Sequence, residues 1–365
     1  VAMDVAGFSP LEADQLRRAF GRRNNAHLIQ TYWVKFREDT NRRGIDEETV
    51  WRIFKKFNGQ YMFPESHAFA FGVTAYQASW LKRYHPLEFY IGLFNQQPMG
   101  FYNLETLKED AKRHGIHTLN PDINLSQEKC VIERGALRLG FLNVATVGSV
   151  AADTIIKTRN EGDPFASIAD FMERTGILQE TMGNLADAGV FDSLARDRRA
   201  VRWEIGLRYR PISQQLALPV SVGLDMVDLP GLTSWERMSG EYRTMGLHPA
   251  AHIMTYLRQR IGSKVTTSKE VVALDDGAEI TVVGLVIRRQ RPLGKAVFIT
   301  LEDEFGHIPL VVWPSEFAKY RQVIREPLLV IRGQVSRRDG TMNIVAQHVE
   351  PMPAMDHLPK AKSWQ

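Results

Sequence analysis

Residues 61–102 read YMFPESHAFAFGVTAYQASWLKRYHPLEFYIGLFNQQPMGFY, and the first half of this stretch predicts one long helix with two different faces. One face repeats large apolar side chains at helical spacing, and the face beside it repeats small ones. The large residues are Phe69, Val73, Tyr76 and Trp80, and the small ones are Ala68, Gly72, Ala75 and Ser79. The large face predicts a contact with a core, whereas the small face would let another backbone or a ligand come close.

Three residues predict where this helix begins and ends. Pro64 stands at the helix start, where its missing N–H costs nothing, and Ser66 is the predicted N-cap. Pro86 ends the run, because proline cannot continue a helix without losing a hydrogen bond.

The composition describes a globular chain with a mild basic excess. At 365 residues, 44% of them hydrophobic, the chain is long enough for two or three domains. The 46 lysines and arginines exceed the 42 acids, giving a net charge of +4, which fits a nucleic-acid partner without demanding one. The single cysteine, Cys130, excludes an internal disulfide and a cysteine-based zinc site, and it favours a reduced, cytoplasmic setting. No apolar run approaches the roughly 18 residues that would span a membrane.

The chain before this stretch is predicted to be helical. Ser9 and Glu12 have the spacing of a capping box, and Asp46 is the predicted cap of a third helix. Arg22 and Arg23 lie in a basic segment between helices and could face a nucleotide or DNA. The alternative is that they are solvated surface charges.

Residues 103–210 predict a helix, two short strands around Gly135 and then two helix-hairpin-helix units. In this motif a tight turn aims backbone N–H groups at a phosphate. The first turn places Thr146 where the motif usually has glycine and then keeps Gly148; because threonine tolerates a positive φ poorly, phosphate binding by this unit is in doubt. The second unit keeps Gly189. The alternative is a helical packing domain without DNA contacts.

The densest basic segment follows, reading DRRAVRWEIGLRYRP over residues 197–211. Arg198 and Arg199 are predicted to contact DNA phosphates, with a solvated helix as the alternative. Residues 211–233 are a predicted linker. Its segment Gln215–Pro219 resembles the peptide by which polymerases grip a sliding clamp, but it lacks the final aromatic residue. Residues 234–262 return to helix, with Ser234 as the predicted cap.

Residues 277–351 predict a five-stranded OB-fold barrel. The order of elements is three strands, a helix and two strands, and the last two strands meet at an Asp339–Gly340 turn. The tail, residues 352–365, is polar and is predicted to be disordered. The predicted fold class is therefore mainly α with a C-terminal all-β barrel.

The barrel also carries a predicted binding surface. Phe298 shares its strand face with Thr300 and Glu302, so this face is expected to be partly solvated. An exposed aromatic ring among basic residues can hold a single strand by stacking and backbone charge. The predicted contacts are Phe298, Trp313, Arg288, Arg289, Arg291 and Lys295. For both aromatic residues the alternative is packing in the barrel, and the acids at 302–304 are interpreted as a turn rather than a metal cluster.

Two segments of the opening stretch resemble a known family. FPESHAFAFGVTAYQASWLKRYHPLEFY and FNQQPMGFY are similar to the end of the fingers region in bacterial C-family DNA polymerases, and QPMGFY resembles the error-prone branch. The tandem helix-hairpin-helix units and the OB-fold follow in the family's order, and PKAKSWQ resembles its C-terminus. The resemblance implies that residues 1–102 are fingers, 103–210 the hairpin region, 211–262 a linker with helices, and 277–351 the OB-fold.

The resemblance also implies a function. It is the C-terminal nucleotide- and DNA-binding part of an error-prone, translesion DNA polymerase that acts in DNA repair and damage tolerance. The implied partners are primer–template and single-stranded DNA, an incoming dNTP, the missing palm part, and a sliding clamp or translesion accessory proteins. The alternative is a stand-alone, non-enzymatic module that binds single-stranded DNA.

The catalytic centre is expected to lie elsewhere in the full-length enzyme. In this family the carboxylates that hold Mg²⁺ belong to a palm domain ahead of the fingers, and the sequence contains no strand-borne acidic pair that could replace them. No catalytic residue and no metal ligand is therefore predicted in this segment, which alone would be inactive. Its abrupt Val-Ala-Met start suggests a truncated or split coding region.

Half of a nucleotide pocket could remain on the long helix. Ser66 and His67 are placed where helix N–H groups and the helix dipole attract a triphosphate. The alternative is capping by Ser66 beside a surface His67. Lys82, about four turns further along the helix, is a weaker candidate for the same ligand.

Overall fold

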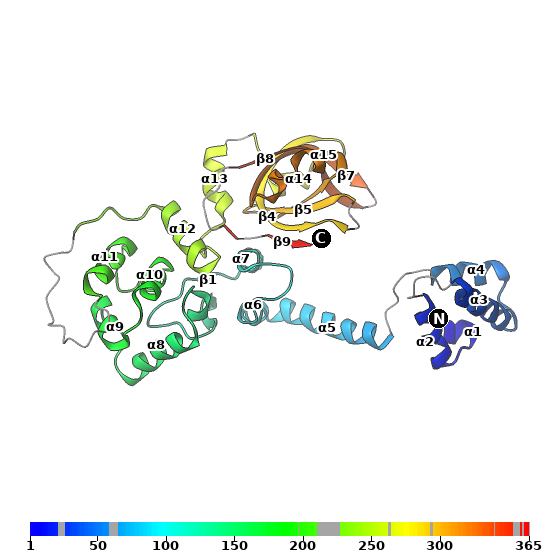
Figure 1. Cartoon of the computed structure of the whole chain (residues 1–365), viewed down its shortest axis with the longest axis horizontal. Helices are drawn as coiled ribbons and strands as arrows, with labels where there is room; N and C mark the ends of the chain where they lie inside the picture. The colour runs from blue at the N-terminus through cyan, green and yellow to red at the C-terminus, as the bar shows by residue number, and fades with distance from the viewer. Residues whose placement is uncertain are drawn as a thin grey trace. The chain divides into compact units, whose positions relative to one another are not determined.

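The chain forms two compact units, Val1–Leu81 and Lys82–Gln365. The computed structural model describes residues 1–20, 26–57, 65–195, 197–209, 227–261, 264–292, 295–338, 340–352, 358–359 and 361–364 (Figure 1). The predicted domain boundary after Tyr102 falls inside the second unit, because Tyr90 and Phe94 are buried in its core.

The first unit is built from short helices around an aromatic core. Its first helices are α1 (Ala2–Ala6), α2 (Pro10–Phe20), α3 (Ala26–Asn41) and α4 (Glu47–Lys56). The rings of Phe20, Phe36 and Phe54 pack together, with Phe20 and Phe36 each within 5.6 Å of Phe54 between centroids. Both predicted caps are confirmed. Glu12 N–H donates to Ser9 Oγ at 3.3 Å, and Thr49 N–H donates to Asp46 Oδ1 at 2.9 Å.

The long predicted helix is α5 (Glu65–Tyr84), and two predictions about it need correction. It begins at Glu65, so Ser66 lies in its first turn and is not the N-cap. Its large face is also not a core contact, since Phe69 is 73% and Tyr76 71% exposed. None of the buried clusters that the described residues form includes a residue of α5.

The second unit starts in the last turn of α5 and continues with helix α6 (Pro86–Asn95), which has Pro86 at its first position. Helix α7 (Leu104–Arg113) follows, and then a small sheet of β1 (Thr118–Leu119), β2 (Val131–Glu133) and β3 (Ala136–Arg138). Strands β2 and β3 form the predicted antiparallel pair, and Gly135 between them adopts a φ of 80°. The 3-10 turn η1 (Phe141–Asn143) ends this segment.

The helical region that follows packs on more than one apolar core: its first four helices belong to the core of residues 90–247, whereas its last two belong to cores shared with residues 280–358. Its helices are α8 (Ser149–Glu161), α9 (Ile168–Thr175), α10 (Gln179–Asp187), α11 (Arg198–Arg208), α12 (Ser234–Met245), α13 (Ile253–Ile261) and α14 (Ser268–Val271). The rings of Phe165, Phe171 and Phe191 are buried against one another at its centre. The cap of α12 is Thr233 rather than the predicted Ser234, because Glu236 N–H donates to Thr233 Oγ1 at 3.2 Å.

A buried network of charged and polar side chains joins α7 to α12. Glu105, on α7, accepts hydrogen bonds from Lys108 Nζ and from Tyr242 Oη, each at 2.9 Å. The backbone N–H of His248 donates to the same carboxylate at 3.0 Å. Further along α12, Glu241 accepts from Arg198 at 2.8 Å. Buried charges need such partners, so this network fixes how α12 sits against α7 and α11.

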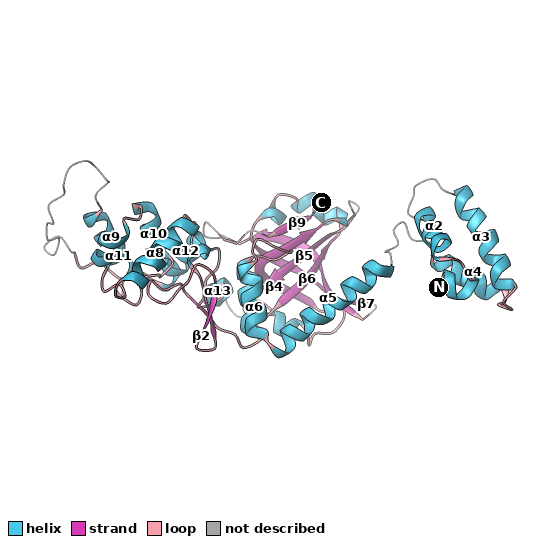
Figure 2. Ribbon diagram, turned by 90° about the horizontal axis from the view of Figure 1, so that it is seen from below, coloured by secondary structure: helices cyan, strands magenta, loops and turns pink. Residues whose placement is uncertain are grey.

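The C-terminal part is a closed five-stranded barrel, as predicted (Figure 2). Its strands are β4 (Glu279–Gln290), β5 (Val297–Glu302), β6 (His307–Val312), β7 (Leu328–Arg338) and β8 (Thr341–Pro351). Helix α15 (Pro314–Tyr320) and the turn η3 (Val323–Arg325) lie between β6 and β7. The strands pair in the order β4-β5-β6-β8-β7-β4, which is the closure of an OB-fold.

Strand β4 is long because it pairs with different neighbours along its length. Its first half pairs with β7 over 279–285, and its second half pairs with β5 over 285–290. A short strand, β9 (Lys362–Trp364), runs parallel to β4 at residues 288–290. The prediction of a disordered tail is therefore wrong for these three residues, since β4 offers them backbone hydrogen-bonding groups.

Candidate nucleic-acid interface

The outer face of strands β4 and β5 gathers the residues predicted to hold a single strand. Phe298 lies opposite Gln290, and Thr300 lies opposite Arg288. Because alternate residues of a strand point to the same face, these four residues share one side of the sheet. Ile299, between Phe298 and Thr300, is buried inside the barrel.

Both predicted aromatic residues are exposed. Phe298 is 42% and Trp313 is 52% exposed, so neither is packed inside the barrel. Trp313 immediately precedes α15. The expected solvation of the Phe298 face is only partly correct, because Glu302, at the far end of the same strand, is fully buried.

The four basic residues predicted around this face differ in what they contact. Arg289 is corrected to a structural residue, because its guanidinium donates to the carbonyls of Ile324, Arg325 and Glu326 at 2.6–2.9 Å. Burial accordingly lowers the pKa of Arg289. Arg291 lies over the ring of Phe317 at 4.2 Å, and Lys295 is exposed.

Arg288 contacts a ring that the sequence analysis did not select. Its guanidinium carbon lies 5.8 Å from the ring centroid of Phe101, a residue that is 50% exposed. Phe101 belongs to the QPMGFY segment after α6, about 190 residues earlier in the chain. The segment was recognised only by its resemblance, and no local pattern indicates which distant arginine it meets.

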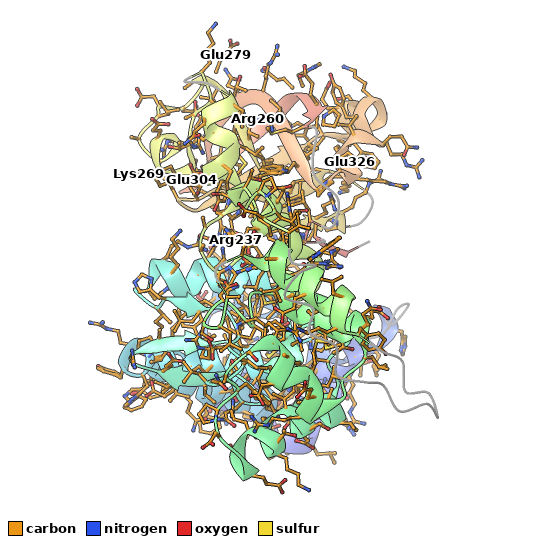
Figure 3. The ribbon with its side chains drawn as sticks, turned by 90° about the vertical axis from the view of Figure 1, so that its left-hand side faces the viewer. Arg237, Arg260, Lys269, Glu279, Glu304 and Glu326 are labelled. Atoms are coloured by element: carbon orange, nitrogen blue, oxygen red, sulfur yellow. The ribbon has the colours of Figure 1, made fainter. Side chains whose placement is uncertain are left out.

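The acids at 302–304 form a turn with ion pairs, as interpreted from the sequence. Glu302 contacts Arg113 at 3.1 Å, and Asp303 accepts the N–H of Ser268 at 2.8 Å. Glu304 accepts from Arg258 Nη2 at 2.8 Å, on the side of the barrel that also carries α14 (Figure 3). Among the residues that the structure describes, no group of three or more possible ligands could hold a metal ion.

The first hairpin turn keeps the conformation that its sequence put in doubt. Thr146 has a φ of 67°, and its hydroxyl is held by Asn184 Nδ2 at 3.1 Å and Thr181 Oγ1 at 3.2 Å. Gly148 follows at the start of α8, where no side chain caps the helix, and a Cβ built there would meet nothing within 4 Å. The N-terminal N–H groups of α8 are thus accessible to an anion.

The second hairpin turn is closed by the protein itself. Gly189 has a φ of 83°, but its N–H donates to Ala186 O at 3.0 Å. A Cβ built on Gly189 would lie 2.2 Å from the guanidinium of Arg198. An arginine therefore covers Gly189, which was predicted to contact DNA.

The basic segment on α11 is largely neutralised. Arg198, which was predicted to contact DNA, is only 4% exposed and contacts Asp192 at 2.6 Å and Glu241 at 2.8 Å. Arg199 pairs with Glu236 at 2.8 Å and stays about one third exposed. A run of arginines reads as a basic surface in sequence, but the acids that neutralise it come from other segments.

A cavity of about 540 Å³ lies between this helix and the first hairpin turn. Thr146 and Asn184 line it together with the side chains of Arg202 and Arg243, which both contact Asp187. Two guanidinium groups share the Asp187 carboxylate here, and the lining also includes Glu180.

The three residues predicted to bind a nucleotide differ in their exposure and contacts. Ser66 is exposed in the first turn of α5, and the ring of His67 packs 4.4 Å from the ring of Phe71. Lys82 forms an ion pair with Asp110 at 2.8 Å, which gives it a structural role instead. Its neighbour Tyr90 also contacts Asp110, and burial raises the pKa of Tyr90.

The predictions for Arg22, Arg23, Pro64 and the segment Gln215–Pro219 lie outside the described residues. Within the part of the chain that is described, no helix is long and apolar enough to cross a membrane.

Comparison with known proteins agrees with the two modules. Residues 115–201 match a helix-hairpin-helix motif, and residues 280–352 match an OB-fold nucleic acid binding domain. The error-prone DNA polymerase of Sinorhizobium medicae (strain WSM419) is 34% identical over 396 residues, which cover 97% of this chain and 35% of that protein. That of Anaeromyxobacter sp. (strain K) is 35% identical over 370 residues, which cover 96% of this chain and 32% of that protein.

The chain spans about a third of the length of the curated relatives that it matches. The resemblance seen in residues 61–102 therefore extends over nearly the whole chain, together with the hairpin motif and the OB-fold. This chain belongs to the error-prone branch of the bacterial C-family DNA polymerases.

Proposed function

We propose that this chain is the DNA-binding part of an error-prone, translesion DNA polymerase and holds single-stranded template on the outer face of its barrel. The observation that carries the proposal is the exposed Phe298 beside Arg288 on the outer face of the barrel. An exposed ring next to a cation can stack on any base and meet the phosphate that follows it. The names of the relatives give the reaction of the whole enzyme, nucleotide addition to a primer.

The first hairpin turn supplies a second contact in this proposal. The uncapped start of α8 at Gly148 can bind a phosphate of the duplex through backbone N–H groups, and Thr146 holds the turn in shape. The second hairpin supports this region from within, because Arg198 fills the space beside Gly189.

The exposed face of α5 is the proposed fingers surface. Phe69, Val73 and Tyr76 are exposed in the described structure, which suits a helix that faces another part of the enzyme. The incoming dNTP would lie near Ser66 and His67, at the helix N-terminus. In this proposal the carboxylates that hold Mg²⁺ come from the palm part, and so does catalysis.

Two assays test the proposal. Fluorescence anisotropy should show that the 365-residue chain binds single-stranded DNA, and that Phe298→Ala weakens this binding. Primer extension should require an added palm part. If the isolated chain extended a primer, the assignment of catalysis to the palm would be wrong.

The second candidate function is a stand-alone module that coats single-stranded DNA. The exposed barrel face would serve it equally well, because OB-folds bind single strands without catalysis. Primer extension separates the two candidates, since the module would give no extension even when the palm part is supplied. A sliding clamp or accessory protein remains a predicted partner of the polymerase.

A further inference from the structure

A second cavity, of about 490 Å³, lies beside the loop that follows α6. Its apolar wall includes Phe94, Tyr102 and Leu142, and its polar wall includes Gln97, Asn143 and Lys129. The cavity has room for a flat ring with polar edges. Most of the residues that line it come from α6, the loop after it, the segment before β2 and the turn η1, and Leu104, Gly246 and Pro359 complete the lining.

The amide of Gln97 leaves a donor without a partner. Gln97 Oε1 accepts the N–H of Met99 at 3.2 Å, which fixes the amide in the loop. Its Nε2 atom is buried and has no hydrogen-bond partner among the described residues. An unsatisfied buried donor is costly, so a ligand that brings an acceptor to this atom would be favoured.

The wall around Gln97 is rigid on one side and charged on the other. Asn95 uses both ends of its amide on the backbone of Cys130, at 3.0 Å and 2.8 Å. Cys130 Sγ in turn donates to Asn143 Oδ1 at 3.1 Å. Lys129 is exposed, and no described carboxylate forms an ion pair with it. The cavity thus combines a preorganised donor with a nearby cation.

Two consecutive residues link the cavity to the outer face of the barrel. Tyr102 lines the cavity, and Phe101 before it lies against Arg288 on the outer face of β4. Arg288 and Phe298 are on the same face of the sheet. A strand that stacks on Phe298 and crosses Arg288 would therefore come next to the loop that carries the cavity.

We propose that this cavity takes one unstacked nucleobase of the single strand that crosses the barrel; the inference rests on the proposed function. The ring would lie against Tyr102 and Phe94, and a carbonyl oxygen of the base would accept the N–H of Gln97 Nε2. Lys129 would meet the phosphate. The lining contains no carboxylate, so it selects an acceptor-rich ligand such as thymine over a cationic side chain.

The test compares two ligands and two matched variants of the 365-residue chain. The ligands are an oligothymidylate and an abasic oligonucleotide of the same length, and affinity is measured by anisotropy. Gln97→Leu removes the donor from the cavity, whereas Gln96→Leu makes the same change at the exposed neighbour, which does not line the cavity. We expect Gln97→Leu to weaken oligothymidylate binding by roughly tenfold, the loss of one hydrogen bond. Gln96→Leu should stay within about twofold of the wild type, since an exposed side chain loses no bond.

The abasic ligand and Lys129→Ala separate a base contact from a fold defect. Gln97→Leu should bind the abasic oligonucleotide as the wild type does. Its unfolding midpoint should change little, because the change removes an unsatisfied donor together with one exposed hydrogen bond, from Met99 N–H, that water can replace. Lys129→Ala should weaken both ligands alike. Equal binding of oligothymidylate by Gln97→Leu and the wild type would overturn the assignment. If Gln97→Leu lost affinity equally for oligothymidylate and the abasic oligonucleotide, the assignment would also be overturned.

Phe298→Ala, measured with the same ligands, distinguishes this inference from the proposed function. If Phe298→Ala weakens oligothymidylate binding and Gln97→Leu does not, the cavity assignment fails while the proposed function stands. If neither variant weakens binding, both fail.

Discussion

Asn184 Nδ2 donates a hydrogen bond to Thr146 Oγ1 at 3.1 Å, from helix α10 to the first hairpin turn. Thr146 has a φ of 67°, a conformation that costs an ordinary residue about 1–2 kcal/mol. The hydroxyl contact offsets this cost, so the threonine replaces a glycine without changing the shape of the turn.

Substitutions at Thr146 should separate the strain from the hydrogen bond. Thr146→Val keeps the strained, branched residue and removes the hydroxyl, and it should lower the free energy of unfolding by about 1–2 kcal/mol. Thr146→Gly removes both terms and should change it by less than about 1 kcal/mol. Urea unfolding measures both. Equal losses in the two variants would mean that backbone strain has no role at this position.

Arg198 should be far more important for stability than its neighbour. Arg198→Met leaves Glu241 buried beside His248 without its guanidinium partner, and should cost about 3–5 kcal/mol of unfolding free energy. Arg199→Met removes a partly exposed ion pair and should cost less than about 0.5 kcal/mol. Similar losses in both variants would contradict the structural role of Arg198.

The thiol of Cys130 should make stability depend on alkaline pH. Burial raises the pKa of Cys130 from 9.0 to about 11. The unfolded chain loses this proton first, so the stabilisation is complete below pH 9 and is lost as pH rises from 9 to 11. The loss should reach about 2–3 kcal/mol, from two pKa units. The variant Cys130→Ala should lack this part of the slope, and thiol reactivity against pH should give the same pKa. If the wild type and Cys130→Ala lost stability with rising pH at the same rate, the role of the Cys130 thiol would be refuted.

On the barrel face, Phe298→Ala should weaken single-strand binding by about 1–3 kcal/mol, the value of stacking one base. Trp313→Ala should have a smaller effect, because Trp313 lies beyond the end of β6 and away from Arg288. Anisotropy at fixed salt measures both. If both variants bound the single strand as the wild type does, the proposal that Phe298 stacks on a base would be wrong.

Lys295→Ala tests the electrostatic contribution to single-strand binding. Its exposed ammonium group should contact one phosphate, so the variant should reduce the salt dependence of binding by about 0.7 in the slope of log K against log salt. Arg289→Ala should instead lower stability, since its guanidinium holds three carbonyl groups. A full loss of salt slope in Arg289→Ala without any loss of stability would reverse these two assignments.

The sequence predicted the barrel well because alternation and turn residues mark each strand locally. It predicted the exposure of Phe298 for the same reason, since its neighbours Val297 and Ile299 point into the core. It did not indicate the intramolecular partners of Arg198 and Arg289, because contacts with acids or carbonyls from distant segments have no local pattern. Phe101 was missed for a similar reason, as its contact with Arg288 joins two distant parts of the chain. The face of α5 was predicted as core from periodicity, which indicates an apolar face but not its partner.

The buried network between α7 and α12 has a consequence for synthesis on the ribosome. Glu105 and Lys108 are buried only when Tyr242, His248 and the carbonyl of Ala251 are in place, and these residues are made more than 130 positions later. Until then the charged side chains of α7 must stay in water, although Leu107 and Ala111 on its apolar side can already pack against α6. The hairpin region between the two segments can fold meanwhile on its own local contacts. The burial of these two charges is therefore completed only after α12 and the residues up to Ala251 have left the exit tunnel.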